Sequence, residues 1–271
     1  MTDLSDVLPA PLGMAVGAVL GLTGAGGAIL AVPLLVFGLQ LSMVQAAPIG
    51  LLAVALSAGL GAVLGWRQGL LRYRAAAFMA AAGLIATPAG LWLAQRVPDK
   101  PLMLLFALVL AGVSLRMLRE ASRKLQGDPG DARGAAPCLL DAGSGRLHWT
   151  PRCAMRLALA GSTAGLLSGL LGVGGGFVLV PALLAVSNLS QQAVVATSMG
   201  VLALVSSGAV LQAAASGTVP WGLAWPFAGG ALAGLLAGRL LASHLAGPRL
   251  QQGFAWLAIA VAISLAIRTF M

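Results

Sequence analysis

The residues best placed to do chemistry are the glycines of two similar runs, GLTGAGGAILAVP at residues 21–33 and GLLGVGGGFVLVP at residues 169–181. Both runs lie in long apolar segments, although glycine costs about 1 kcal/mol and proline about 3 kcal/mol in a helix interior. A helix that stops and restarts presents free backbone N–H groups and the positive end of a helix dipole, which together attract anions. The two runs therefore predict helix breaks that bind an anion through the main chain.

We expect the second helix of each pair to begin near Gly27 or Ala28 in the first half of the chain and near Gly175 or Gly176 in the second. The predicted helix-breaking prolines are Pro33 and Pro181, and Arg239 is the one cation predicted to reach inward toward the anion. The predicted substrate-binding residues are Gly24, Gly26, Gly27, Gly172, Gly174, Gly175, Gly176, Thr197 and Ser198.

Each of these residue types also has a purely structural use. Glycines permit close helix crossings or a kink in membrane helices. Serine and threonine hydroxyls can bond to a carbonyl one turn earlier, and an arginine such as Arg239 can extend to the membrane interface. The sequence leaves these alternatives open.

Composition indicates an integral membrane protein: 59% of the residues are hydrophobic and 8% are charged, and the apolar runs are about 20 residues long. The net charge is +9, with lysine and arginine at segment ends and in one central loop. This placement is typical of positive-inside anchoring, and it does not form the basic, aromatic face of a nucleic-acid-binding protein. We expect a lipid bilayer as the environment, and no nucleic acid as a partner.

The predicted fold is an all-α, multi-pass membrane protein with two homologous four-segment repeats. We expect a first transmembrane repeat at residues 1–118, a cytoplasmic linker at 119–152 and a second repeat at 153–271. The apolar segments cover approximately residues 10–37, 43–65, 75–95, 101–118, 153–186, 191–215, 220–243 and 250–270.

The repeat is visible in glycine triplets 148 positions apart, each with a spacing of four that places its members on one helix face. Small residues four apart let membrane helices approach closely, so we expect these faces to pack against other helices. The triplets are Gly13, Gly17 and Gly21 in the first half, and Gly161, Gly165 and Gly169 in the second.

The first segment of each half is too long for one ordinary span, since residues 11–37 would cover ~40 Å as a helix against a hydrocarbon core of ~30 Å. Either a tilted helix unwinds at the glycines, or two helices enter and return to the same side. The second arrangement leaves three true spans per half and makes the repeats inverted. Arginines at 67, 72 and 74, against no basic residue at 216–221, favour inversion.

Chemistry that needs carboxylates in the membrane is not supported, because every Asp and Glu is expected in a tail or loop. This argues against an Asp/Glu proton relay, a multi-carboxylate metal site and a membrane enzyme, and we expect no metal or other cofactor and no catalytic residue. Cys138 and Cys153 flank the linker without metal-ligand spacing. With the linker in the reducing cytoplasm, we interpret both as incidental thiols.

The doubled Gly-x-Gly-Gly-(x)5-Pro, at Gly24–Pro33 and Gly172–Pro181, and the Ala-Thr-Ser at Ala196–Ser198 resemble the TauE/SafE family of membrane permeases. The likeness covers nearly the whole chain except the linker. It implies export of small anions such as sulfite or sulfoacetate across the bacterial inner membrane. The first half departs from the family pattern at Ala28 and at Pro48-Ile49, so we expect two unequal half-sites.

The function expected from the residues and the resemblance is a secondary transporter of a small anion, working by alternating access between the two repeats. The expected partners are this anion, the bilayer and a second copy of the chain. Two alternatives stay open: a non-transporting membrane scaffold, and a transporter of a neutral solute or a metal cation.

Overall fold

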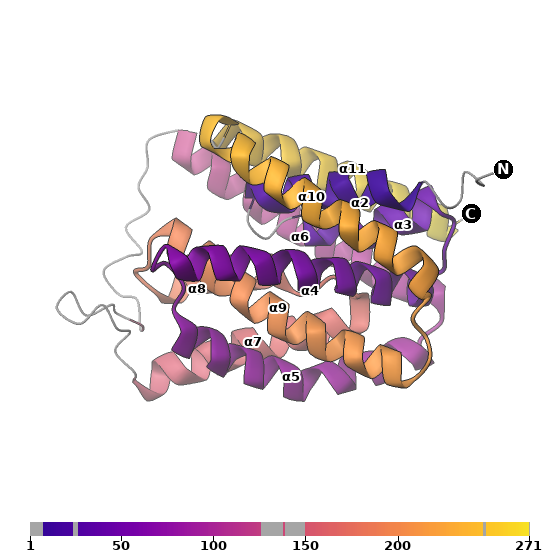
Figure 1. Cartoon of the computed structure of the whole chain (residues 1–271), viewed down its shortest axis with the longest axis horizontal. Helices are drawn as coiled ribbons and strands as arrows, with labels where there is room; N and C mark the ends of the chain where they lie inside the picture. The colour runs from indigo at the N-terminus through magenta and orange to yellow at the C-terminus, as the bar shows by residue number, and fades with distance from the viewer. Residues whose placement is uncertain (1–7, 24–26, 126–137, 139–149, 246–247, 271) are drawn as a thin grey trace.

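A computed structural model describes residues 8–23, 27–125, 138, 150–245 and 248–270, and helices make up nearly all of this part of the chain (Figure 1). The all-α prediction is confirmed. The described helices are α2 (Pro9–Thr23), α3 (Ala28–Gly38), α4 (Met43–Arg67), α5 (Tyr73–Arg96), α6 (Asp99–Leu125), α7 (Pro151–Leu171), α8 (Gly176–Val186), α9 (Gln191–Ala215), α10 (Trp221–Leu245) and α11 (Pro248–Phe270).

Five of the described helices, α4, α5, α7, α9 and α10, are long and apolar enough to cross a membrane. The predicted apolar segments match the helices closely, with one extension: α6 continues to Leu125, past the predicted end of the first repeat at residue 118. Glu120 therefore lies in a helix and not in a loop, close to its C-terminal end.

Both opening segments are interrupted at the predicted glycines. Gly27 precedes α3 and Gly175 precedes α8, so both second helices begin where the sequence predicts. The prediction that prolines break the helices is wrong, because α3 continues through Pro33 and α8 through Pro181. Each proline removes one N–H donor, and a single lost hydrogen bond does not end either helix.

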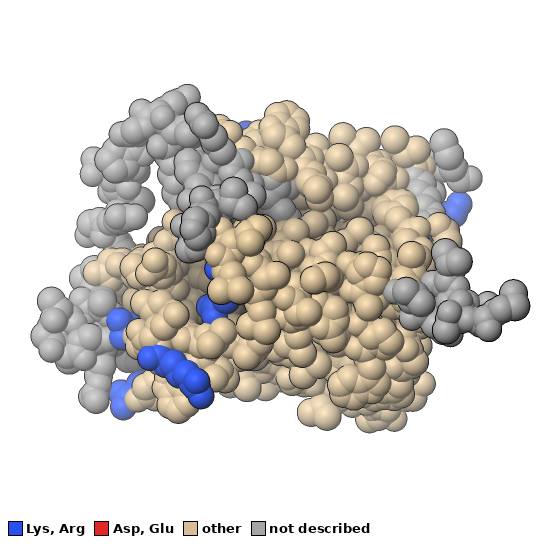
Figure 2. Space-filling view, turned by 45° about the horizontal axis from the view of Figure 1, so that its top comes forward, with Lys and Arg blue, Asp and Glu red and all other residues tan. Residues whose placement is uncertain are grey.

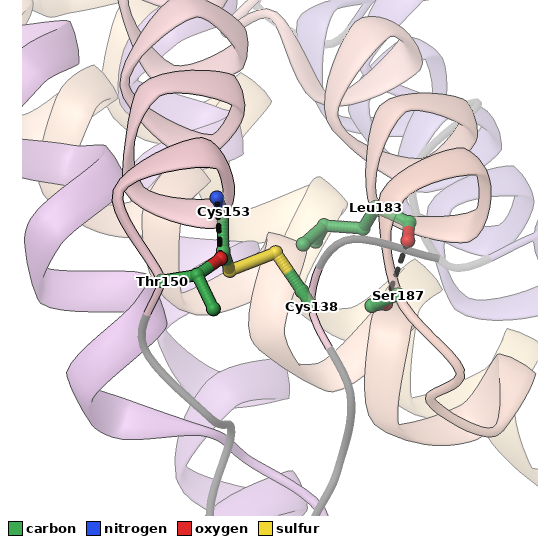
Figure 3. Close-up of a disulfide and its surroundings, with 5 residues drawn as sticks. All are labelled: Cys138, Thr150, Cys153, Leu183 and Ser187. Carbon is green, nitrogen blue, oxygen red and sulfur yellow. Dashed lines mark hydrogen bonds between the residues drawn. A yellow bond between two sulfur atoms is a disulfide. The ribbon is translucent and has the colours of Figure 1, made fainter. Parts of the chain in front are cut away.

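Each interrupted segment folds back on itself, as the second of the two predicted arrangements requires. The N–H of Cys138 donates to the carbonyl of Val186 at the end of α8, and Cys138 is disulfide-bonded to Cys153 in the first turn of α7 (Figure 3). In the first half, a methyl group on Gly38 at the end of α3 would lie 2.8 Å from Leu12 near the start of α2. Helix α3 thus returns to the end of the molecule where α2 begins, and α8 returns to the opposite end, where α7 begins (Figure 1).

Helices α4 and α9, which correspond in the two halves, cross in opposite directions. A methyl group on Gly65 of α4 would lie 2.7 Å from Cβ of Ala196, and one on Gly59 would lie 3.9 Å from Cβ of Ala203. Residue numbers along α4 decrease as those of their contacts in α9 increase, so the two helices are antiparallel. Three further pairs each join a helix of the first half to a helix of the second: α2 lies against α10, α5 against α7, and α6 against α11 (Figure 1).

The glycine triplets form the closest of these contacts, which confirms their predicted packing role. A methyl group on Gly17 would collide with the backbone of Ala231 in α10, and one on Gly165 with the backbone of Gly83 in α5. Only helices without side chains at these positions can approach so closely. The triplets therefore hold α2 to α10 and α7 to α5.

The two cysteines form a disulfide with Cα atoms 5.1 Å apart, so their interpretation as incidental thiols is wrong. Thr150 caps α7 by accepting a hydrogen bond from the N–H of Cys153 at 3.1 Å, which fixes that cysteine at the helix start. The pairing of Cys138 with the end of α8 brings the second sulfur within reach. Spacing along the chain could not reveal a contact that depends on the linker returning to α8.

We expect Cys153→Ser to lower the unfolding free energy by about 3 kcal/mol, the value for a disulfide that closes a loop of this length in the unfolded chain. Thermal unfolding in detergent, with and without dithiothreitol, measures the effect. The reductant should lower the unfolding temperature of the wild type to that of the variant and leave the variant unchanged. A wild type that is indifferent to the reductant would contradict the disulfide.

Candidate functional site

The second break is built from glycines in a left-handed backbone conformation. Gly172, Gly174 and Gly175 have φ angles of +71°, +73° and +69°. Residues with a Cβ adopt this region at a cost of roughly 1–2 kcal/mol each, whereas glycine enters it freely. The GxGG spacing is therefore explained by backbone geometry.

The N-terminus of α8 carries no side-chain cap. Gly175 is the N-cap residue, and its carbonyl accepts hydrogen bonds from the N–H groups of Val178 and Leu179 at 3.1 and 3.3 Å. The N–H groups that open a helix have no intrahelical acceptor. Among the hydrogen bonds of the described chain, none has the N–H of Gly174, Gly175 or Gly176 as its donor.

This break is buried at the centre of the helical body. A methyl group on Gly174 would lie 3.0 Å from Cγ1 of Val54 and 3.0 Å from Cδ2 of Leu202, and these residues stand near the middle of α4 and α9. Gly175 abuts the backbone of Ala164 near the middle of α7. The free end of α8 thus lies at the mid-depth of three helices long and apolar enough to span a membrane.

Three buried serine hydroxyls in this part of the molecule have no hydrogen-bond partner: Ser57 on α4, Ser168 on α7 and Ser206 on α9. A buried hydroxyl without a partner costs roughly 1–3 kcal/mol. Sequence reasoning missed all three, because a serine in an apolar helix usually bonds to its own backbone. Their position beside the break depends on the fold. Ser206, for example, is one turn after Leu202, which contacts Gly174.

Thr197 and Ser198 lie elsewhere and use their hydroxyl protons within α9. Thr197 Oγ1 donates to the carbonyl of Ala193 at 2.7 Å and accepts a hydrogen bond from the N–H of Arg72 at 3.2 Å. Ser198 Oγ donates to the carbonyl of Val195 at 2.9 Å. Both stand near the start of α9, beside the turn between α4 and α5, at a different depth from the second break.

The first break differs from the second. Gly24 and Gly26 lie outside the described residues; Gly27 has a right-handed backbone, with φ −60° and ψ −33°, and packs against Leu20. Arg239 of α10 lies near this break and not near the second one: a methyl group on Gly21 would lie 2.9 Å from its backbone nitrogen. The structure therefore separates Arg239 from the left-handed glycines.

A cavity of about 40 Å³ lies between α4, α5, α7 and α9. Its lining includes Ala47, Gly169 and Leu170, and Ala47 also packs against Gly172 of the second break. The cavity thus lies beside the end of α7 that leads into the break, at the level where α4 begins.

We expect Gly174→Ala to destabilise the protein more than Gly69→Ala, and Gly222→Ala to have the smallest effect. Gly174 combines a left-handed backbone with close neighbours, Ser206 Oγ among them at 2.9 Å from an added methyl group. Gly69 has φ +69° and open space, and Gly222 has open space alone. Thermal unfolding in detergent ranks the three variants. Equal unfolding temperatures for Gly174→Ala and Gly222→Ala would contradict the described backbone.

The sequence profile of the family described as "Sulfite exporter TauE/SafE" matches residues 10–265. The chain is 31% identical over 276 residues to a "Probable membrane transporter protein" of Xylella fastidiosa strain 9a5c, covering 100% of this chain and 98% of that protein. A protein of the same description from strain Temecula1 is 32% identical over 278 residues, with the same coverage. No solved structure matches the chain.

Proposed function

The chain belongs to the TauE/SafE sulfite exporter family and is a membrane transporter, and from this premise we propose that it exports a small anion, such as sulfite or a sulfonate, across the bacterial inner membrane by alternating access. The anion is held by main-chain N–H groups at the broken helices and not by a buried charge.

The observation that carries this proposal is the uncapped N-terminus of α8 at mid-depth, reached through left-handed glycines. A helix terminus buried in an apolar protein needs a partner for its N–H groups, and the positive end of the dipole favours an anionic one. Backbone of this kind is tolerated in a membrane where protein or a wet cavity surrounds it. Gly172 and Gly176 complete this break, and we assign the corresponding role in the first half to Gly24, Gly26 and Gly27.

Alternating access requires two units that move against each other, and we propose that these are inverted repeats. The antiparallel crossing of α4 and α9 supports this, because corresponding helices of inverted repeats run in opposite directions. The packed pairs also agree with inverted repeats. Helix α2 corresponds to α7 and α10 to α5, so the pair of α2 with α10 matches the pair of α7 with α5 when the halves are interchanged. We propose that Thr197, Ser198 and Arg239 contact the anion only as it enters or leaves, because none of them lies at the second break.

The test is uptake of radiolabelled sulfite and sulfoacetate into proteoliposomes, with and without an imposed pH gradient. The wild type should transport at least one of these anions. We expect Gly175→Leu to abolish transport while the protein still inserts, since a side chain there meets the backbone of Ala164. Gly229→Leu, at an exposed position of α10 with open space, is the matched control and should transport normally. Flux through neither the wild type nor the control would favour a scaffold.

We further propose that the end of the molecule bearing the linker faces the cytoplasm. Basic residues gather at this end (Figure 2), among them Arg67 at the end of α4 and Arg152 at the start of α7, as the positive-inside rule requires. The disulfide at Cys153 is the opposing observation, because disulfides persist in oxidising compartments. We base the proposed orientation on the basic residues, because several of them gather at this end and the disulfide is a single opposing feature.

A reporter fused after Met271 tests the orientation, since α11 runs from the linker end toward the opposite end (Figure 1). With a cytoplasmic linker, an alkaline phosphatase fusion should be active and a green fluorescent protein fusion dark. The reverse result would place the linker outside the cell and the disulfide in an oxidising compartment.

A further inference from the structure

Three serines depart from the usual behaviour of hydroxyl groups in this protein. The hydroxyls of Thr87 and Ser114 donate to carbonyls one turn earlier in their own helices, at 2.8 and 2.7 Å. Ser57, Ser168 and Ser206 are fully buried, and their hydroxyls make no such bond and have no other partner. A hydroxyl that leaves its own backbone acceptor unused is free to bond to something else.

All three come from the helices that surround the second break. An added methyl group on Gly174 would lie 2.9 Å from Oγ of Ser206, so this hydroxyl is aimed at the break itself. Ser168 is in the last turn of α7, where its carbonyl accepts a hydrogen bond from the N–H of Gly172. Ser57 is one turn after Val54 on α4, and Val54 contacts the break.

We propose that Ser57, Ser168 and Ser206 complete an oxyanion site at the second break, together with the N–H groups that open α8. This inference rests on the proposed function and deepens it. Hydroxyl and main-chain N–H groups can all donate to the oxygens of a sulfite, sulfonate or similar oxyanion, and no cation is needed. A halide, which has no separate oxygens to share among several donors, fits such a donor set less well.

The serine hydroxyls belong to the second break alone among the positions related by the repeat. The positions related to these serines by the 148-residue offset are Val205, Leu20 and Ala58, none of which carries a hydroxyl. The serine hydroxyls are therefore not repeated at the corresponding first-half positions, and the two breaks offer unequal sets of donors.

Binding of radiolabelled sulfite to the purified protein and its transport in proteoliposomes test this site in the variants Ser57→Ala, Ser168→Ala and Ser206→Ala. We expect each variant to bind sulfite at least tenfold more weakly and to show a raised KM. The unfolding temperature without anion should not fall, because alanine removes a hydroxyl that has no partner. In the wild type, sulfoacetate should compete with sulfite and chloride should not.

Ser114→Ala is the matched control, since its buried hydroxyl bonds to Leu110 on α6, away from the break. It should leave sulfite affinity unchanged. A wild type that transports sulfite together with three serine variants of unchanged affinity would overturn the serine site and leave the proposed function intact. Variants that gain thermal stability without losing affinity would show that the hydroxyls hold water only, and would also overturn it. A wild type that neither binds nor moves any of the anions would overturn the proposed function and this inference together.

Discussion

The structure depends on one constraint: backbone that leaves its helix inside a membrane must be enclosed by protein or by a wet cavity. The second break meets this constraint because α4, α7 and α9 surround it on several sides, with Val54, Ala164 and Leu202 in contact with its glycines. The return of α8 along α7 follows from the same need, since a helix that ends at mid-depth can expose neither terminus to lipid. The long helices of the fold thus enclose the interrupted ones.

Glycine contributes to this enclosure in two different ways. At Gly172, Gly174 and Gly175 it permits a left-handed backbone, which makes the turn into α8. At Gly17 and Gly165 the backbone is an ordinary helix, and the missing side chain allows a neighbouring helix to approach. A membrane interior supplies little hydrophobic force between helices, so close packing of this kind carries much of their association. The breaks stay enclosed because the surrounding helices are held this closely.

The sequence predicted the features that depend on local residue pattern. The starts of α3 and α8 follow from glycines whose conformational freedom is intrinsic, and the packing faces follow from a spacing of four residues. Three features were missed or wrong. Pro33 lies inside α3, because one missing N–H donor does not end a helix. The other two depend on the tertiary structure: the disulfide of Cys138 with Cys153 requires the contact of Cys138 with α8, and the hydroxyl of Ser206 has no partner beside the break.

A site made of hydroxyls and main-chain dipoles suits a transporter better than one made of buried cations. A lysine or arginine at mid-depth would have to be stripped of water whenever the site is empty, and this costs several kcal/mol in a low dielectric. A neutral donor left without a partner costs roughly 1–3 kcal/mol, which is less than the cost of a buried ion. Arg239 lies beside the first break and away from the left-handed glycines, so the donors proposed at the second break are all neutral groups.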